Sequence, residues 1–364
     1  MKILLVTMEY PPDRGGVGNY YFNLVKNLTD HQVEVFKADD SSFYKFFWPR
    51  WIKLFFAIKK IIRQEKPDLI WVGQVLPIGE AVYLIKKFFK IPYFVSTHGM
   101  DIRLPQKSAR KKMAMLKVLQ SAEFMTANSQ YTKDQLLKLG IKEEKIEVVY
   151  PCPHINLKLK AQSSKLEEIK ERLNIKDKKI ILTVGRLVKR KGQEMVIKLM
   201  PRLLEKFPNL VYLIIGEGID SSKLKAQSSK LGLNDKIVFL EHVSDEELPL
   251  YYQLADVFVM PARDLDGDVE GFGMVYLEAA NFGLPVIAGK SGGAAEAVVD
   301  GQTGLLVNPE DENDVYEKIV KLLSDEGLRN KMGEMGKLRV KRDFQWSGQA
   351  MLLSNKIQIP SYKK

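Results

Sequence analysis

Cysteine and histidine are scarce in this sequence of 364 residues, which contains one cysteine, Cys152, and four histidines. A single cysteine cannot form an internal disulfide, which excludes a disulfide-stapled secreted domain and fits a reducing cytoplasm. The few scattered Cys and His residues form no zinc-binding pattern. Residues 264–268 resemble the start of a calcium loop, but the twelfth position is Val275 instead of Glu. We therefore expect no metal ion and no other cofactor.

Long hydrophobic runs are also missing. No apolar run reaches about 18 residues, the length that a membrane-spanning helix needs. The apolar opening, residues 1–7, is too short for the core of a signal peptide and leads into Glu9. We expect a cytoplasmic protein, and its length allows two domains of ordinary size.

In the first half of the chain, acidic residues are too few to balance the basic ones, whereas in the second half the two kinds are equal in number. Residues 1–160 hold 26 Lys and Arg against 15 Asp and Glu, whereas residues 161–364 hold 30 of each kind. The whole net charge of +11 therefore lies in the first half. This asymmetry indicates an acidic partner for that half, either a membrane surface or a nucleic acid.

Strand-like and helical patterns alternate along both halves of the chain. The predicted strands are residues 3–7, 33–36, 69–73, 93–97, 124–127 and 146–149, then 180–184, 211–216, 237–240, 257–260, 285–288 and 305–307. Such alternation predicts parallel sheets with helices on both faces. We expect an α/β protein of two doubly wound domains that face a central cleft, where the carboxyl ends of parallel strands present ligand-binding groups.

The pattern breaks near Pro151 and a polar, charged segment follows. We place an N-terminal domain at residues 1–155, a boundary segment at 156–177 and a C-terminal domain at 178–343.

The segment around which the rest is organised is Glu270 to Glu278, with the sequence Glu-Gly-Phe-Gly-Met-Val-Tyr-Leu-Glu. It follows a predicted strand and a loop, so a helix is expected to begin near Met274. Gly271 and Gly273 let the backbone approach a ligand closely, and the free N–H groups of a first helical turn attract an anion. Two carboxylates beside such a turn suit a ligand with both phosphate and hydroxyl groups, such as a sugar nucleotide. An ordinary loop–helix junction is the alternative.

Three further motifs stand at predicted strand ends. A glycine-rich turn with Gly15, Gly16 and Gly18 follows the first strand and is suited to phosphate, although it lacks the dinucleotide-binding spacing. His98-Gly99 follows the fourth strand, in a position where ligand groups are expected. After the first strand of the second half, Arg186 and Lys191 carry charges that suit a diphosphate, with a solvated basic turn as the alternative.

Residues 41–64 contain no acidic residue but six basic and eight aromatic ones. A second acid-free stretch, residues 103–117, is also basic. This composition predicts an interfacial membrane patch, with packing of some aromatics against the core as the alternative. Nucleic-acid binding also fits the composition but not the motifs at the strand ends. The candidate membrane-contact residues are Lys45, Trp48, Arg50, Trp51, Lys53, Arg110, Lys111 and Lys112.

Taken in order, the glycine-rich turn, His98-Gly99, Gly185-Arg186 with Lys191-Gly192, the pair Glu270 and Glu278, and residues 291–296 resemble glycosyltransferase family 4. Residues 268–278 are most similar to its phosphatidylinositol mannosyltransferase branch. The resemblance extends over nearly the whole chain. It implies retaining enzymes of the GT-B fold, with residues 344–364 crossing back onto the first domain.

The resemblance also implies a role for each matching residue. Arg186 and Lys191 would hold the donor diphosphate, with Gly15 and Gly16 nearby. Glu270 would bind hydroxyls of the donor sugar, Glu278 would bind the ribose, and His98 would lie beside the sugar at the reacting centre. The remaining donor-site candidates are Gly271, Phe272, Gly273, Met274, Val275, His242 and Val243. On the acceptor side, the candidates are Glu9, Asp13 and Asp101.

We therefore expect a hexosyltransferase that uses a nucleoside-diphosphate sugar, GDP-mannose before a UDP-sugar, and a glycan or lipid-linked acceptor at the inner face of the membrane. The expected reaction needs no metal, because protein cations and a helix N-terminus stabilise the leaving diphosphate. Two departures from the family pattern, residues 150–154 and His242, put the base preference in doubt. A sugar-nucleotide epimerase, a transferase with a soluble acceptor and a non-enzymatic binding module are the alternatives.

Overall fold

The computed structural model describes residues 1–12, 15–38, 51–153, 163–266 and 268–358. The chain divides into two compact units. The first unit consists of residues 1–152 together with residues 344–364, and the second consists of residues 153–343. Both units are parallel α/β structures, which confirms the predicted fold class.

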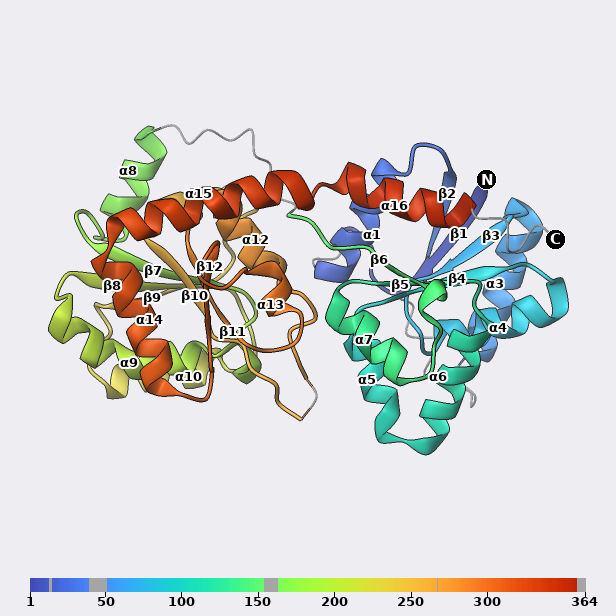
Figure 1. Ribbon diagram of the computed structural model, residues 1–364, viewed down its shortest axis with the longest axis horizontal. Helices are drawn as coiled ribbons and strands as arrows, with labels where there is room; N and C mark the ends of the chain where they lie inside the picture. The colour runs from blue at the N-terminus through green and yellow to red at the C-terminus, as the bar shows by residue number, and fades with distance from the viewer. Residues whose placement is uncertain (13–14, 39–50, 154–162, 267, 359–364) are drawn as a thin grey trace. The chain divides into compact units, whose positions relative to one another are not determined.

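A six-stranded parallel sheet forms the centre of the first unit (Figure 1). Its strands are β1 (Lys2–Thr7), β2 (Gln32–Lys37), β3 (Leu69–Val72), β4 (Tyr93–Thr97), β5 (Met125–Ala127) and β6 (Ile146–Val148). Their order in the sheet is β2-β1-β3-β4-β5-β6. The strands are runs of apolar residues because both faces of the sheet are covered.

Helices cover both faces of this sheet. They are α1 (Gly16–Asn27), α3 (Ile52–Glu65), α4 (Ile78–Phe89), α5 (Met100–Arg103), α6 (Ala109–Ser121), α7 (Gln130–Lys138) and α16 (Trp346–Gln358), with short 3-10 turns η1 (Leu104–Lys107) and η2 (Glu143–Lys145). Successive residues of β1 point to opposite faces: Ile3 and Leu5 pack with α1 and α16, whereas Leu4 and Val6 pack with α3, α4 and α6.

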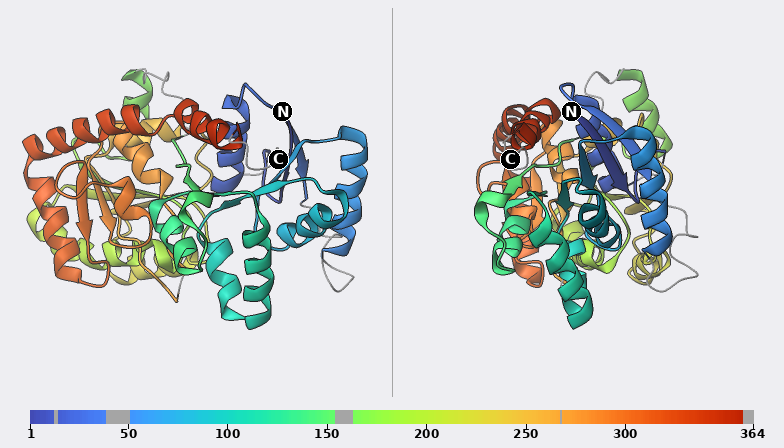
Figure 2. Two further views of the ribbon diagram at one scale, coloured as in Figure 1. Left: turned by 45° about the vertical axis from the view of Figure 1, so that its right-hand side comes forward. Right: turned by 90° about the vertical axis from the view of Figure 1, so that its right-hand side faces the viewer.

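Helix α16, from the end of the chain, packs along α1 (Figures 1 and 2). Leu353 and Ile357 of α16 are fully buried in the same cluster as Tyr20 and Leu24 of α1. The backbone N–H of Tyr150 also donates to Gln349 Oε1 at 2.7 Å. The first unit is therefore built from both ends of the chain.

The second unit repeats the scheme with a sheet in the order β12-β11-β10-β7-β8-β9. Its strands are β7 (Lys179–Val184), β8 (Leu210–Ile215), β9 (Ile237–Leu240), β10 (Val257–Met260), β11 (Val286–Gly289) and β12 (Gly304–Val307). Its helices are α8 (Ser163–Arg172), α9 (Gln193–Lys206), α10 (Ser221–Lys230), α11 (Leu248–Leu254), α12 (Met274–Asn281), α13 (Ala294–Ala297), α14 (Glu312–Ser324) and α15 (Glu326–Asp343), with the 3-10 turn η3 (Lys189–Lys191).

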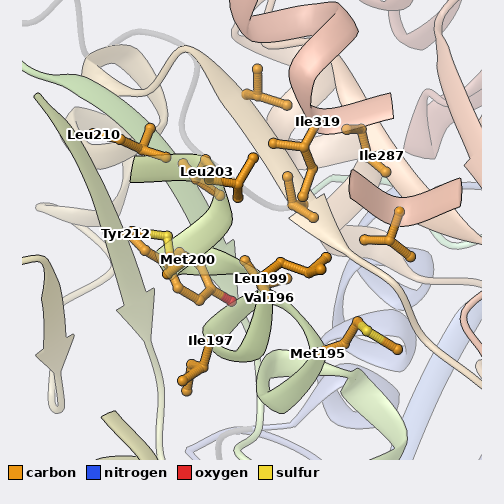
Figure 3. Close-up of a cluster of buried hydrophobic side chains, with 14 of the residues drawn as sticks. Met195, Val196, Ile197, Leu199, Met200, Leu203, Leu210, Tyr212, Ile287 and Ile319 are labelled. Atoms are coloured by element: carbon orange, nitrogen blue, oxygen red, sulfur yellow. The ribbon is translucent and has the colours of Figure 1, made fainter. Parts of the chain in front are cut away.

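A large apolar cluster holds α9 and α14 against this sheet (Figure 3). Met200 and Leu203 of α9 pack with Tyr212 of β8, and Ile319 of α14 packs near Ile287 of β11. On the opposite face, Phe258 of β10 contacts the rings of Tyr252 in α11 and Tyr276 in α12. These contacts fix the starts of α9 and α12 at the carboxyl edge of the sheet, where the site residues lie.

Helix α8 falls within the predicted boundary segment, residues 156–177, and belongs to the second unit. There Ile169 is buried, and Arg172 donates a hydrogen bond to Tyr251 Oη at 2.8 Å. None of the helices in the described ranges combines the length and apolar character that a membrane span requires.

Candidate functional site

Helix α12 begins at Met274, as the sequence predicts, and Gly273 precedes it with φ of +88°. A Cβ at this position would lie 2.5 Å from the ring of Tyr276, so both the backbone conformation and the space require glycine. Phe272 is buried, whereas Gly271, Met274 and Val275 are partly exposed. The first turn of α12 therefore presents backbone N–H groups beside an accessible surface.

Glu270 lies just before this turn and binds two cations. Its Oε2 accepts from Lys191 Nζ at 2.5 Å and from Arg190 Nη1 at 2.7 Å. All three residues are buried, and Arg190 Nε also lies 3.0 Å from Oδ1 of Asp268. The structure thus brings together Lys191 and Glu270, which belong to separate sequence motifs, and adds Arg190.

The charges in this cluster perturb one another. Burial alone would raise the pKa of Glu270, but Lys191 and Arg190 outweigh it and the pKa lies below its usual value. Burial lowers the pKa of Lys191, and Glu270 opposes that change. Glu270 is therefore a carboxylate that already accepts hydrogen bonds from two cations.

Gly292 and Gly293, after β11, support the backbone of Glu270. The N–H of Gly293 donates to the Glu270 carbonyl at 2.8 Å. A Cβ on Gly292 would lie 2.1 Å from the Glu270 carbonyl oxygen, and one on Gly293 would lie 2.3 Å from that of Gly271. These glycines let two loops from different strands approach closely. In the sequence they appeared only as part of the family motif.

Arg186 and Lys191 both follow β7, but their side chains differ in environment. Lys191 is buried against Glu270, whereas Arg186 is exposed. The Arg186 side chain makes no hydrogen bond or ion pair with any residue that the structure describes. Gly192 has φ of +79°, and a Cβ there would lie 2.4 Å from the Pro261 carbonyl oxygen, so this turn packs against the end of β10. Among the described residues, Arg186 is thus an unpaired cation beside a buried ionic cluster.

Glu278 lies on α12 and accepts a hydrogen bond from Tyr252 Oη of α11 at 2.9 Å. Burial raises the pKa of Glu278 to about 7, although the bond from Tyr252 lowers it. Tyr252 is itself buried and stacked on Phe282 with ring centroids 5.6 Å apart. Tyr252 was missed in the sequence because nothing in the motif points to a partner on another helix.

His242 follows β9, next to partly buried Val243. His242, which departs from the family pattern, has φ of +56°, a conformation that favours glycine. Its Nδ1 lies 2.7 Å from Oε1 of Glu217, and its side chain is 78% exposed. The pair stands at the ends of β8 and β9.

In the first unit, His98 follows β4 and is partly buried. Its Nε2 lies 2.6 Å from Tyr21 Oη, and its backbone N–H donates to Asp101 Oδ1 at 2.9 Å. Burial lowers the pKa of His98 to about 4. Burial also raises the pKa of Asp101 to about 7, against several backbone hydrogen bonds that lower it. His98 is therefore neutral at pH 7.

Glu9 and the glycine-rich turn stand at the end of β1. Glu9 is exposed, and a Cβ on Gly15 would lie 3.0 Å from Glu9 Oε2. Gly16 is the first residue of α1. Asp13 lies outside the described residues, so nothing tests its predicted place on the acceptor side.

Of the predicted membrane-contact residues, Lys45, Trp48 and Arg50 also lie outside the described residues. Trp51 is partly buried against the core, which is the alternative that the sequence left open for some of these aromatics. Lys53 lies in the first turn of α3. Arg110, Lys111 and Lys112 are exposed in the first turn of α6. Within the described ranges, no three His, Cys, Asp or Glu side chains lie close enough together to hold a metal ion.

Two protein-family models match successive parts of the chain. Residues 14–153 match the family described as Glycosyltransferase Family 4, and residues 165–339 match Glycosyl transferases group 1.

Two curated relatives match over nearly the whole chain. The GDP-mannose-dependent monoacylated alpha-(1-6)-phosphatidylinositol monomannoside mannosyltransferase of Corynebacterium glutamicum is 30% identical and covers 98% of each chain. The GDP-mannose-dependent alpha-(1-6)-phosphatidylinositol monomannoside mannosyltransferase of Mycolicibacterium smegmatis is 29% identical over 94% of this chain and 95% of that protein.

The crystal structure of Anabaena HepE in complex with UDP has the same fold, with a TM-score of 0.81 and 21% identity over 98% of this chain and 99% of that one. None of these matches supports the epimerase alternative. The chain belongs to glycosyltransferase family 4 and is a glycosyltransferase with the GT-B fold.

Proposed function

We propose that this glycosyltransferase transfers a mannosyl group from GDP-mannose to a lipid-linked glycan acceptor of the phosphatidylinositol mannoside type, with retention of configuration at the anomeric carbon. The observation that carries the donor assignment is the buried cluster in which Glu270 accepts from Lys191 and Arg190 beside the start of α12. The names of the relatives support GDP-mannose and the lipid-linked acceptor.

Each predicted donor-site residue has a role in this proposal. Lys191 and exposed Arg186 bind the diphosphate, together with backbone N–H groups at the start of α12. Glu270 accepts hydrogen bonds from sugar hydroxyls, and Glu278 accepts them from the ribose. Gly15 and Gly16 are assigned to the phosphate and His242 and Val243 to the base. His98 is assigned to the reacting centre on the resemblance alone.

The proposed reaction is a same-face displacement in which the leaving phosphate takes the proton of the acceptor hydroxyl. Glu270 is a poor candidate for a covalent nucleophile, because its carboxylate already accepts hydrogen bonds from Lys191 and Arg190 and its pKa lies below the usual value. Negative charge that develops on the diphosphate is stabilised by Lys191 and Arg186. These cations do the work that a metal ion does in other transferases, so we propose that no cofactor is needed.

The test is transfer of label from GDP-mannose and from UDP-glucose to phosphatidylinositol monomannoside in detergent. We expect label in the lipid from GDP-mannose only, with the new anomeric bond in the α configuration, and undiminished activity in EDTA. Donor turnover without acceptor would favour an epimerase, and EDTA inhibition reversed by magnesium would reveal a metal site. Label from UDP-glucose alone would overturn the donor assignment.

We further propose that the first unit docks on an anionic membrane surface, at the inner face of the membrane. Phe56 on α3 is 59% exposed and Phe88 on α4 is 71% exposed. Phe55 joins the two helices through ring contacts with both residues. We define the α3–α4 surface as Phe56, Lys59, Lys60, Lys87, Phe88 and Lys90. Three of its lysines are exposed: Lys60, Lys87 and Lys90. Leu104 and Met113 are exposed near the basic turn of α6 in the same unit.

Exposed aromatics surrounded by lysines suit an anionic bilayer. Each lysine near such a surface contributes about 1 kcal/mol to the free energy of binding. The test is co-sedimentation with neutral and anionic vesicles. A variant with Lys59, Lys60, Lys87 and Lys90 changed to Ser is expected to lose binding to anionic vesicles. A control with Lys223, Lys230 and Lys331 of the second unit changed to Ser should bind as the natural protein does. Equal binding of the natural protein to both vesicle types would contradict the proposal.

A further inference from the structure

His98 has one ring nitrogen bound to a side chain that no sequence motif singles out. Tyr21 of α1 is fully buried, and its Oη contacts both the Gly73 carbonyl oxygen and His98 Nε2. A tyrosine hydroxyl has a single hydrogen, and a carbonyl oxygen has none. The hydroxyl hydrogen of Tyr21 therefore points to Gly73.

This leaves Tyr21 Oη as an acceptor toward His98. The short contact of 2.6 Å with Nε2 then requires that Nε2 carry the imidazole proton and donate it to Tyr21. The other nitrogen, Nδ1, is unprotonated in neutral His98. In the part of the chain that the structure describes, Nδ1 makes no hydrogen bond.

The surroundings hold the ring and its partner in place. Tyr20 and Tyr21 contact the His98 ring edge-on at centroid distances of 5.2 and 5.4 Å. The backbone of His98 is tied to Asp101, and Gly99 turns the chain with φ of +92°. Burial raises the pKa of Tyr21 well above its usual value, so the hydroxyl keeps its proton. The ionisable groups around this pair are Asp101, Glu9 and Tyr20.

We propose that Tyr21 is a positioning residue that holds His98 in the Nε2–H tautomer and so presents Nδ1 as a hydrogen-bond acceptor for a sugar hydroxyl. The assignment of the tautomer follows from the contacts of Tyr21. The identification of a sugar hydroxyl as the group that donates to Nδ1 rests on the proposed function. Because the buried hydroxyl already holds this tautomer, His98 does not have to change its protonated nitrogen when the substrate binds.

The first measurement is long-range ¹H–¹⁵N NMR of the full-length protein labelled at its four histidines, with His98 assigned by its loss in His98→Gln. We expect a neutral Nε2–H imidazole at pH 7 in the natural protein. In Tyr21→Phe, Nε2 loses its acceptor, so we expect the Nδ1–H tautomer to appear. This measurement needs no substrate and is therefore independent of the proposed function.

The second measurement is transfer kinetics, with Tyr20→Phe as the matched control. Tyr20 is the neighbouring buried tyrosine. Its hydroxyl donates to the Val149 carbonyl at 3.2 Å instead of to a ring nitrogen of His98. Tyr21→Phe should lower kcat by about tenfold to a hundredfold, as loss of the partner that orients a metal-binding histidine does, with the donor KM nearly unchanged. Tyr20→Phe should keep both kcat and the tautomer.

An Nδ1–H tautomer in the natural protein would overturn the inference. So would an unchanged tautomer in Tyr21→Phe, or an equal loss of kcat in both variants. If no sugar transfer is found with any acceptor, the proposed function fails, while the tautomer measurement still decides the role of Tyr21.

Discussion

At the scale of single residues, Glu270 combines a buried carboxylate with two buried cations. An exposed ion pair contributes little to folding, but removing one member of a buried cluster leaves uncompensated charge. Glu270 therefore supports folding and, in our proposal, sugar binding at once. A substitution at this position must be compared with one that removes a similar ion pair but no predicted donor contact.

Glu270→Gln is expected to lower the free energy of unfolding by about 3 kcal/mol, because Arg190 and Lys191 lose their shared partner. It should also remove most transfer activity. Glu194→Gln is the matched control, since Glu194 Oε1 pairs with buried Arg263 at 2.5 Å in the same unit. Urea denaturation and initial rates measure both effects. If the control loses as much activity as Glu270→Gln, the loss reflects stability alone.

The raised pKa of Glu278 predicts that the stability of the fold and the donor KM both change with pH near neutrality. Its pKa is about 7 in the folded protein against a usual value of 4.5. The unfolded chain therefore releases this proton first, and the contribution of Glu278 to stability, complete below pH 4.5, is lost as the pH rises through about 7. Ionised Glu278 is the better acceptor for ribose hydroxyls, so the donor KM should fall over the same rise.

Measuring donor KM from about pH 6 to pH 8 tests this prediction, since the range brackets the raised pKa. Glu278→Gln should have a higher KM that no longer changes with pH. Tyr252→Phe removes the bond that lowers the pKa, so its KM profile should shift to higher pH. A flat profile in the natural protein would show that Glu278 does not titrate here.

At the scale of elements, the loop before α13 supports the loop before α12. Gly292→Ala would place a Cβ 2.1 Å from the Glu270 carbonyl oxygen, in a backbone with φ of +55°. One of the two loops must move, and small displacements of positioned groups have large effects on catalysis. We expect the affinity for GDP to fall by about tenfold or more, measured by titration calorimetry.

Gly301→Ala is the control for backbone strain alone. Gly301 also has a positive φ, of +72°, but a Cβ there would meet nothing within 4 Å. This variant should lose about 1 kcal/mol of stability and bind GDP normally. If Gly292→Ala binds GDP equally well, the contact between the two loops does not support the donor site.

At the scale of the whole molecule, α16 makes the first unit depend on the last part of the chain. Leu353 is fully buried among side chains of α1, whereas Met351 on the same helix is 61% exposed. Leu353→Ala should destabilise the first unit by about 3 kcal/mol, and Met351→Ala should change its stability by less than about 0.5 kcal/mol.

Hydrogen exchange followed by mass spectrometry separates the two units. In Leu353→Ala, peptides from residues 1–152 should lose protection, while peptides from residues 163–266 keep it. Equal loss of protection in both sets would mean that the two units unfold together.

Much of this fold follows from local sequence patterns. Each sheet is parallel and covered on both faces, so its strands are continuous apolar runs that can be recognised one by one. The start of α12 was predictable for a similar reason, since Gly271 and Gly273 interrupt the pattern directly before a helical one. Glu270, Lys191 and His98 could be named as candidates because chemical groups at the carboxyl ends of parallel strands face a common edge.

The partners of these residues depended on the tertiary structure. Arg190 stands beside Lys191 in a run of basic residues, and only the packing of η3 against the loop before α12 distinguishes its buried ion pair from a solvated charge. Tyr252, Gly292 and Tyr21 likewise act on residues that are distant in the sequence or on other elements. Periodicity records which face of an element is buried, but not which side chain on another element completes a hydrogen bond there. The sequence by itself therefore determined the strands, the helix starts and the chemical groups at their ends, whereas long-range packing decided how those groups are paired and charged.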